Sequence, residues 1–308
     1  MARVVVLGAT SREISIDVSS YPKVDHLVEA SHYRERTSGR GARQAVACAR
    51  LKAQVSLISA VGTDGSERPV MTDLEQEKVH TRGVKVIRGG HTSLEVTLNL
   101  SFGGYGKVLY PGVSHMLSPQ HVLEQGKLFE GAHCALFQLE LKPETVLEGM
   151  RCAKRAGCLV LLDPYPPANL PDELWPLVDL VMPNAEELAR LSQKDDPDEG
   201  ARRIINWGAQ AVVAHLGPLG AIVYSKGSRP RSLQAFRVDT EDHSGAGDAF
   251  AAGMAVALAE GKDIEEAARF ACAAGALACT RKGTMDSFPI REEVEALLRA
   301  QPRPGSSI

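Results

Sequence analysis

The chain has 308 residues, of which 44% are hydrophobic and 24% are charged, and its formal net charge is -3. This composition excludes a mostly disordered chain, and the lack of excess positive charge argues against nucleic acid or an anionic membrane as partner. The length suits one large core with a smaller appendage, and a small molecule is the expected ligand.

The N-terminal segment predicts a cytoplasmic location. The apolar run before Gly8 is too short for a signal peptide or a membrane span. The six cysteines form no CxxC pair and lie mostly in apolar stretches, so we expect them to be reduced core residues.

Short apolar runs alternate with helical patterns along the chain. Predicted strands lie at 4–7, 55–58, 135–137, 159–162, 180–182 and 211–213, and predicted helices at 42–51, 143–156 and 185–191. This alternation predicts an α/β fold in which helices cover both faces of a parallel sheet.

Two segments depart from the alternation. Residues 14–37 alternate polar and apolar side chains, and residues 91–110 look like strands interrupted by Gly103-Gly104. We expect a small separate sheet that acts either as a flap over a ligand crevice or as extra edge strands. The tail 301–308 is expected to fray.

A helix start and a turn between strands could contribute to a nucleotide site. Asn184 and Glu187 lie three residues apart after a strand, where they could hold hydrated Mg²⁺ or simply cap the helix. His215, Gly217 and Gly220 mark a glycine-containing turn between strands, which suits either a nucleotide against the backbone or a plain hairpin.

The segment Asp242-His243-Ser244-Gly245-Ala246-Gly247-Asp248 is the most informative part of the chain. Gly245, Ala246 and Gly247 form a turn that opens a helix, whose free N–H groups and dipole favour an anion. Asp248 beside that anion hole is placed to take a proton from an attacking hydroxyl, although it could instead only cap the helix.

Together these segments resemble the PfkB sugar-kinase family, specifically its ribokinase-like branch. The DTxGAGD signature is matched at 242–248, GGKGANQA at 38–45, a sugar-reaching segment at 138–140, and the closing segment at 278–283 and 287–289. The resemblance implies a ribokinase-like three-layer α/β/α (Rossmann-like) core with a small β-sheet lid. It places the core at 1–10, 38–90 and 111–308, and the lid at 11–37 and 91–110.

The resemblance also implies ATP-dependent phosphorylation of a hydroxymethyl group on a sugar-like substrate, with Mg²⁺. Asp248 would be the base, and Asn184 and Glu187 would lie near the metal and phosphates. The substrate residues would be Ser11, Glu13, Gly39, Arg40, Arg43, Glu140 and Asp248. An activating K⁺ would be held by Asp242, with Ser244, Ala278, Arg281, Gly283 and Ser287 along its cage.

The sugar-binding end departs from the family pattern. Ser11 and Glu13 replace an Asn and an Asp, Arg40 replaces the lysine of GGKGAN, and Arg43 replaces its asparagine. Guanidinium only donates hydrogen bonds and prefers carboxylate or phosphate, which argues against ribose itself. Arg43 could pair with an acidic or phosphorylated sugar, could form a structural ion pair with Glu13 or Glu140, or could belong to a degenerate pocket.

Two alternatives to a sugar kinase follow from these departures, and a third is disfavoured. A nucleoside kinase of the same fold and a catalytically degenerate ATP- and sugar-binding regulatory protein both remain open. A Rossmann dehydrogenase is disfavoured, because Gly8 begins no GxGxxG motif. The lid could also mediate a homodimer.

Overall fold

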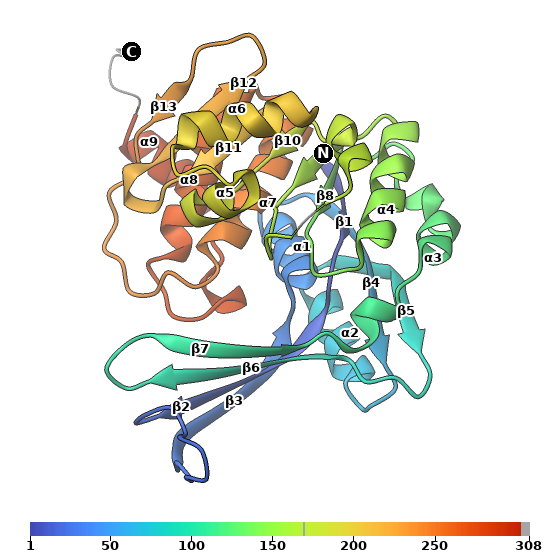
Figure 1. The fold of residues 1–308 in the computed structure, drawn as a ribbon, viewed down its shortest axis with the longest axis vertical. Helices are drawn as coiled ribbons and strands as arrows, with labels where there is room; N and C mark the ends of the chain where they lie inside the picture. Colours follow the sequence, from blue (N-terminus) through green and yellow to red (C-terminus); the bar gives the residue numbers. More distant parts are fainter. Residues whose placement is uncertain (169, 303–308) are drawn as a thin grey trace.

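The computed structural model describes residues 1–168 and 170–302, and it shows a layered core with a smaller sheet projecting from it (Figure 1). The core is built on a nine-stranded sheet with the order β13-β12-β11-β10-β9-β8-β1-β4-β5. Its strands are β1 (Arg3–Leu7), β4 (Gln54–Gly62), β5 (Val79–Ile87), β8 (Cys134–Phe137), β9 (Leu159–Leu162), β10 (Leu180–Val181), β11 (Ala211–His215), β12 (Ala221–Ser225) and β13 (Arg231–Leu233).

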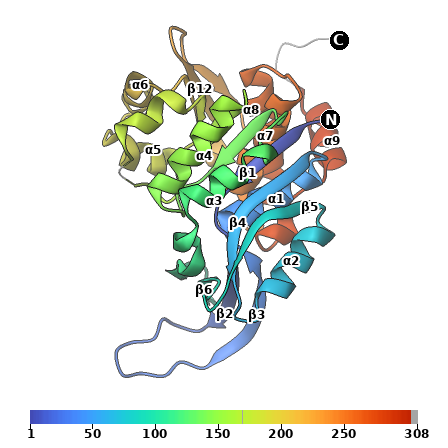
Figure 2. The same ribbon diagram turned by 90° about the vertical axis from the view of Figure 1, so that its right-hand side faces the viewer.

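Helices cover both faces of this sheet (Figure 2). One layer contains α1 (Arg40–Arg50), α2 (Glu67–Gln76), α7 (Ala246–Ala259), α8 (Ile264–Ala278) and α9 (Arg291–Ala300). The opposite layer contains α3 (Pro119–Glu124), α4 (Pro143–Arg155), α5 (Ala185–Ser192) and α6 (Pro197–Trp207). Short 3-10 turns are η1 (Gly112–Met116), η2 (Gly126–Leu128), η3 (Asp172–Leu177), η4 (Gly217–Leu219) and η5 (Met285–Ser287).

Strand β1 shows why both faces must be covered. Val4 and Val6 pack into the core on the α1 side, whereas Val5 and Leu7 pack into the core on the α4 side. A strand with apolar side chains on both faces is stable only between two layers of helices. The predicted α/β/α class is therefore confirmed, with the difference that β12 pairs antiparallel with β11 and β13 pairs antiparallel with β12.

The smaller sheet has the order β3-β2-β6-β7. Its strands are β2 (Ser11–Val18), β3 (Ala30–Ser38), β6 (Ser93–Leu100) and β7 (Tyr105–Tyr110). Strands β2 and β6 run parallel, and antiparallel β3 and β7 flank them. We call this sheet the lid.

The two faces of the lid differ in polarity, and the polar face is the one that packs against the core. Side chains that face the core, such as Glu13, Glu95 and Thr97, are polar and buried. The opposite face carries apolar side chains that are only half-buried or exposed, such as Ile14, Val96 and Val108. Strand alternation therefore puts a polar layer against the core and an apolar layer outside.

Two further expectations concern the chain as a whole. All six cysteines are unpaired and none is exposed, in agreement with the sequence. Gln301 does not fray, because its side chain makes two hydrogen bonds to the backbone of Arg237, while residues 303–308 lie outside the described part of the chain. No helix within the described residues is long and apolar enough to cross a membrane.

Candidate active site

Asp248 lies in the first turn of α7, at the edge of the sheet where the parallel strands end. Gly245 precedes the helix with φ of 81°, and a Cβ there would lie 2.9 Å from the Phe288 ring, so this position requires glycine. Among the described residues, the N–H groups of Gly247 and Asp248 donate no hydrogen bond. This helix start therefore offers two free donors and the positive end of a dipole to an anion.

The carboxylate of Asp248 is buried, with 4% of the residue exposed, and both oxygens are occupied. Arg43 Nε donates to Oδ2 at 2.7 Å, and Gln44 Nε2 donates to Oδ1 at 3.1 Å. Arg43 also donates to the Ser38 hydroxyl at 2.9 Å and lies 3.4 Å from the Glu95 carboxylate. The Asp248 side chain is thus held in place by two hydrogen bonds and covered by a guanidinium.

This arrangement corrects the expected internal partner of Arg43. Neither Glu13 nor Glu140 forms an ion pair with Arg43 within the described residues, although both are buried nearby. Arg43 is itself 5% exposed, so it is not turned into solvent. Its partners come from α7 and from the lid, at sequence separations of 205 and 52 residues.

Asp163 is a further member of this cluster that the sequence analysis missed. Its carboxylate accepts from Arg40 at 2.7 Å and from Gln44 at 2.5 Å, and the Arg40 guanidinium lies 3.7 Å from the centre of the Tyr165 ring. Burial raises the pKa of Asp163, and Arg40 opposes that shift. Its position immediately after strand β9 was the available signal, because parallel strands end at one edge.

The lid contributes a second charged layer. Glu13 accepts from Arg36 Nε at 2.9 Å and from the Thr97 hydroxyl at 2.9 Å, and Lys107 lies 3.7 Å from it. Burial opposes ionisation of Glu13, but Arg36 and Lys107 outweigh it and lower the pKa. The expected substrate residue Glu13 therefore already has two basic partners within the lid.

Glu95 connects the lid to the core, and the sequence analysis missed it as well. Its carboxylate accepts from the Ser11 hydroxyl at 2.7 Å and lies 3.4 Å from both Arg43 and Lys107. Burial would raise the pKa of Glu95, yet Arg43 and Lys107 lower it to about 2. The sequence signal was weak, since alternation in β6 shows only that every second residue shares a face.

Asn184 and Glu187 form a reciprocal helix cap at the start of α5. The Asn184 side chain accepts from the Glu187 N–H at 2.8 Å, and the Glu187 carboxylate accepts from the Asn184 N–H at 2.8 Å. Contrary to the alternative of a solvated Glu, Glu187 is 5% exposed; burial and the charge of Asp163 raise its pKa to about 7. The Asn184–Glu187 pair thus caps α5 and also brings a buried carboxyl group close to Asp163.

His215 ends β11 beside these groups. Its ring packs 4.9 Å from the Phe250 ring, and burial, followed by the charge of Arg40, lowers its pKa to about 4, so the imidazole is neutral at pH 7. Gly217 and Gly220, with φ of 55° and 90°, form the turn into the antiparallel strand β12. The predicted turn between strands is present.

Asp242 joins two loops next to the α7 turn. One carboxylate oxygen accepts from the Ser244 N–H at 2.9 Å, and the other accepts from the Gly283 N–H at 2.9 Å. Burial opposes ionisation, but these hydrogen bonds lower the pKa of Asp242. The Arg281 side chain forms an ion pair with Glu293 of α9. The part of Arg281 that remains available to a cation beside Asp242 is therefore its backbone carbonyl.

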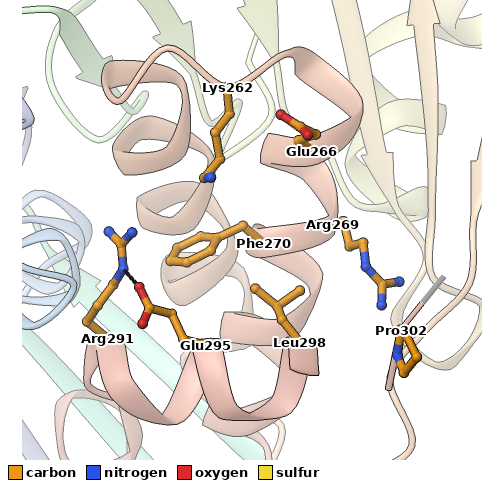
Figure 3. Close-up of a pocket in the computed structure, with 8 residues that line it drawn as sticks. All are labelled: Lys262, Glu266, Arg269, Phe270, Arg291, Glu295, Leu298 and Pro302. Atoms are coloured by element: carbon orange, nitrogen blue, oxygen red, sulfur yellow. Dashed lines mark hydrogen bonds and ion pairs between the residues drawn. The ribbon is translucent and has the colours of Figure 1, made fainter. Parts of the chain in front are cut away.

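A hollow of about 390 Å³ lies between α8 and α9 (Figure 3). Arg291, in its wall, is bonded to Glu260 and Glu295 and lies over the Phe270 ring. None of the site residues lines this hollow. It is distinct from the cluster around Asp248.

The sequence profile described as pfkB family carbohydrate kinase matches residues 1–291. The chain belongs to this family. It is therefore a carbohydrate kinase, a phosphotransferase with an alcohol group as acceptor, and the family predicted from the sequence is confirmed.

Individual relatives agree with the family assignment. The chain is 32% identical to a ribokinase of Haemophilus influenzae over 293 residues, covering 94% of this chain and 95% of the relative. It is 32% identical to a ribokinase of Bacillus subtilis over 304 residues, covering 97% and 100%. The structure of an Arabidopsis thaliana ribokinase complexed with ribose and ATP is similar at a TM-score of 0.89, with 27% identity and coverage of 97% and 99%.

Proposed function

We propose that this carbohydrate kinase uses ATP to phosphorylate a hydroxymethyl group of a sugar-like substrate, with Asp248 as the base. The observation that carries the proposal is the pairing of a buried carboxylate with the free N–H groups of Gly247 and Asp248. The similar Arabidopsis protein was solved with ribose and ATP, which supports the same ligand classes here.

Different residues of the chain have different roles in the proposed reaction. Asp248 accepts the proton of the attacking hydroxyl, and the free N–H groups stabilise negative charge on the phosphoryl group as it is transferred. Asn184, Glu187, His215, Gly217 and Gly220 lie on the nucleotide side. The lid covers the acceptor and excludes water.

Magnesium fits this edge of the sheet. Asp163 and Asp248 lie close enough to Glu187 that their charges help burial to raise the pKa of Glu187. Within residues 1–168 and 170–302 no three acidic, His or Cys side chains are grouped to hold a metal alone. Mg²⁺ that is bound mainly by phosphates and water needs only one or two carboxylates, of which Glu187 is the best placed. Bound Mg²⁺ would neutralise charge on the phosphates.

Potassium fits the Asp242 loops. Among the described residues, the backbone carbonyls of Ala278, Arg281, Gly283 and Ser287 accept no hydrogen bond. Unpaired carbonyl oxygens beside an ionised carboxylate suit a monovalent cation, which would fix the turn at Ser244 and Gly245. We therefore propose that K⁺ activates the enzyme.

A regulatory protein that has lost catalysis is a second candidate, because the closed site leaves little room for an acceptor next to Asp248. Arg43 covers Asp248, and the neighbouring cavity under the lid holds about 10 Å³, room for about one water molecule. An acceptor hydroxyl can reach Asp248 only after Arg43 and the lid move. A nucleoside kinase would need the same movement and a larger cavity.

ADP release separates these candidates. We expect release with ATP, Mg²⁺ and K⁺ when sugars, sugar alcohols or amino sugars are supplied, and a lower rate when Na⁺ or tetramethylammonium replaces K⁺. Release with nucleosides alone would indicate the nucleoside kinase. Binding of ATP without release for any acceptor would indicate the regulatory protein, and equal rates in all three cations would remove K⁺ from the proposal.

We also propose that the lid mediates a homodimer. Its outer face carries half-buried Ile14 and Val96 beside Tyr33 and Val108, which are 60% and 67% exposed. A sheet face of this kind is covered by another apolar face in stable proteins. Sedimentation should give a dimer for the native chain and a monomer for Val96→Lys, whereas a native monomer at about 50 μM would contradict the proposal.

A further inference from the structure

The cavity under the lid has an unusual chemical lining. Its polar walls consist of two carboxylates and three hydroxyls, contributed by Glu95, Glu140, Ser11, Ser93 and Ser114. The remaining walls are Ala9, Gly39, Leu109 and Pro111, so none of its lining residues is a Lys, Arg or His. The cavity therefore presents acceptors and negative charge.

The nearby guanidinium groups are already paired with carboxylates, and of their buried nitrogens within the described residues only Arg40 Nε lacks a hydrogen-bond partner. Arg43 makes its short contacts to Asp248 and Ser38, at 2.7 and 2.9 Å. Arg40 is bonded to Asp163 at 2.7 Å and stacks on Tyr165. An anionic substrate in the cavity would meet Glu95 and Glu140 before it met a free cation.

The buried charges around the cavity do not balance. The carboxylates are those of Glu13, Glu95, Glu140, Asp163 and Asp248, and the cations facing them are Arg36, Arg40, Arg43 and Lys107. These five carboxylates thus face four cations, and buried Glu187 adds a further carboxyl group next to Asp163 and Arg40. A buried carboxylate without a cation is costly unless it is protonated or gains a partner.

Among the carboxylates that line the cavity, Glu140 has no cationic side chain within ion-pair distance in the described part of the chain. It is 8% exposed, and Arg40 N–H donates to its Oε2 at 3.0 Å. Its other oxygen accepts no hydrogen bond from the described residues. Burial raises the pKa of Glu140 to about 7, in keeping with a carboxylate that lacks a fixed cation.

We propose that the acceptor is an amino polyol or amino sugar whose ammonium group binds between Glu95 and Glu140. Because the closed cavity has room for about one water molecule, the acceptor enters when the lid moves. The ammonium then adds a positive charge and donates to both carboxylates, and the serine hydroxyls bind the neighbouring hydroxyls of the acceptor. Glu95, from the lid, is the residue that determines this specificity. The inference rests on the proposed function, because it assigns the substrate class of the same site.

Three matched six-carbon polyols test the proposal. D-glucitol is neutral, 1-amino-1-deoxy-D-glucitol is cationic and D-gluconate is anionic at pH 7.5. Calorimetry with a non-hydrolysable ATP analogue should show the amine binding at least about tenfold more tightly than D-glucitol, with D-gluconate the weakest. Equal binding of all three, tighter binding of D-gluconate, or no binding of the amine would overturn the proposal.

Variants separate the subsite from the fold and from the chemistry. Glu95→Gln and Glu140→Gln should each reduce the preference for the amine over D-glucitol at least about threefold. Glu35→Gln is the matched control, because Glu35 is an exposed lid residue bonded to Arg12 and Tyr33. An unchanged preference in both pocket variants would contradict the role of Glu95 and Glu140.

Phosphorylation is measured separately as ADP release. If the amine binds as expected but no acceptor yields ADP, the subsite stands and the proposed kinase reaction fails. If a neutral sugar yields ADP and the amine does not bind, the kinase stands and the subsite fails.

Discussion

Asp248→Asn should lower turnover at least about a hundredfold, because an amide cannot accept the proton of the attacking hydroxyl. The asparagine keeps the shape of the carboxylate and one oxygen for hydrogen bonding to Arg43. The free N–H groups that open α7 are unaffected, so ATP binding should persist. The checks are ADP release at saturating substrates and a separate titration of ATP binding.

Asp263→Asn serves as the control for this substitution. Asp263 caps the next helix, α8, by accepting from the Glu266 N–H at 2.8 Å, and asparagine retains that acceptor. Its turnover should match the native enzyme. Near-normal turnover of Asp248→Asn would show that Asp248 is not the base and serves only as the hydrogen-bond partner of Arg43 and Gln44.

Arg43→Met should lower the free energy of unfolding by about 3–5 kcal/mol, the usual effect of removing one partner of a buried ion pair. Asp248 would keep Gln44 but lose its contact at 2.7 Å, and Glu95 would lose one of its two cations. Urea denaturation at pH 7 measures the change. A loss below about 1 kcal/mol would show that the guanidinium is not needed to balance these carboxylates.

Two comparisons sharpen the Arg43 experiment. Arg43→Met combined with Glu95→Gln should be less destabilised than the sum of the single variants, because the two side chains interact directly. Arg190→Met provides a surface control, since the ion pair of Arg190 within the described residues is with exposed Glu186 at 3.6 Å. We expect that control to change stability by less than about 0.5 kcal/mol.

Strands, helices and the α7 turn could be predicted from the sequence because their signals are local. Strand Leu159–Leu162 has the expected bounds, and Gly245 lies in the predicted turn at the start of α7. Apolar alternation, helix caps and glycine turns depend on residues a few positions apart. The family motifs predicted which segments lie near Asp248, but not the side chains that bond to it.

The partner of Arg43 depended on the tertiary structure. Several carboxylates were equally suitable by chemistry. The sequence suggested Glu13 or Glu140 as the internal partner, whereas the structure pairs Arg43 with Asp248 and Glu95. Glu95 faces the core because β6 aligns with β2 so that Glu95 lies beside Glu13. A shift of one residue would have placed Leu94 there, and strand pairing of this kind is set by contacts between distant segments.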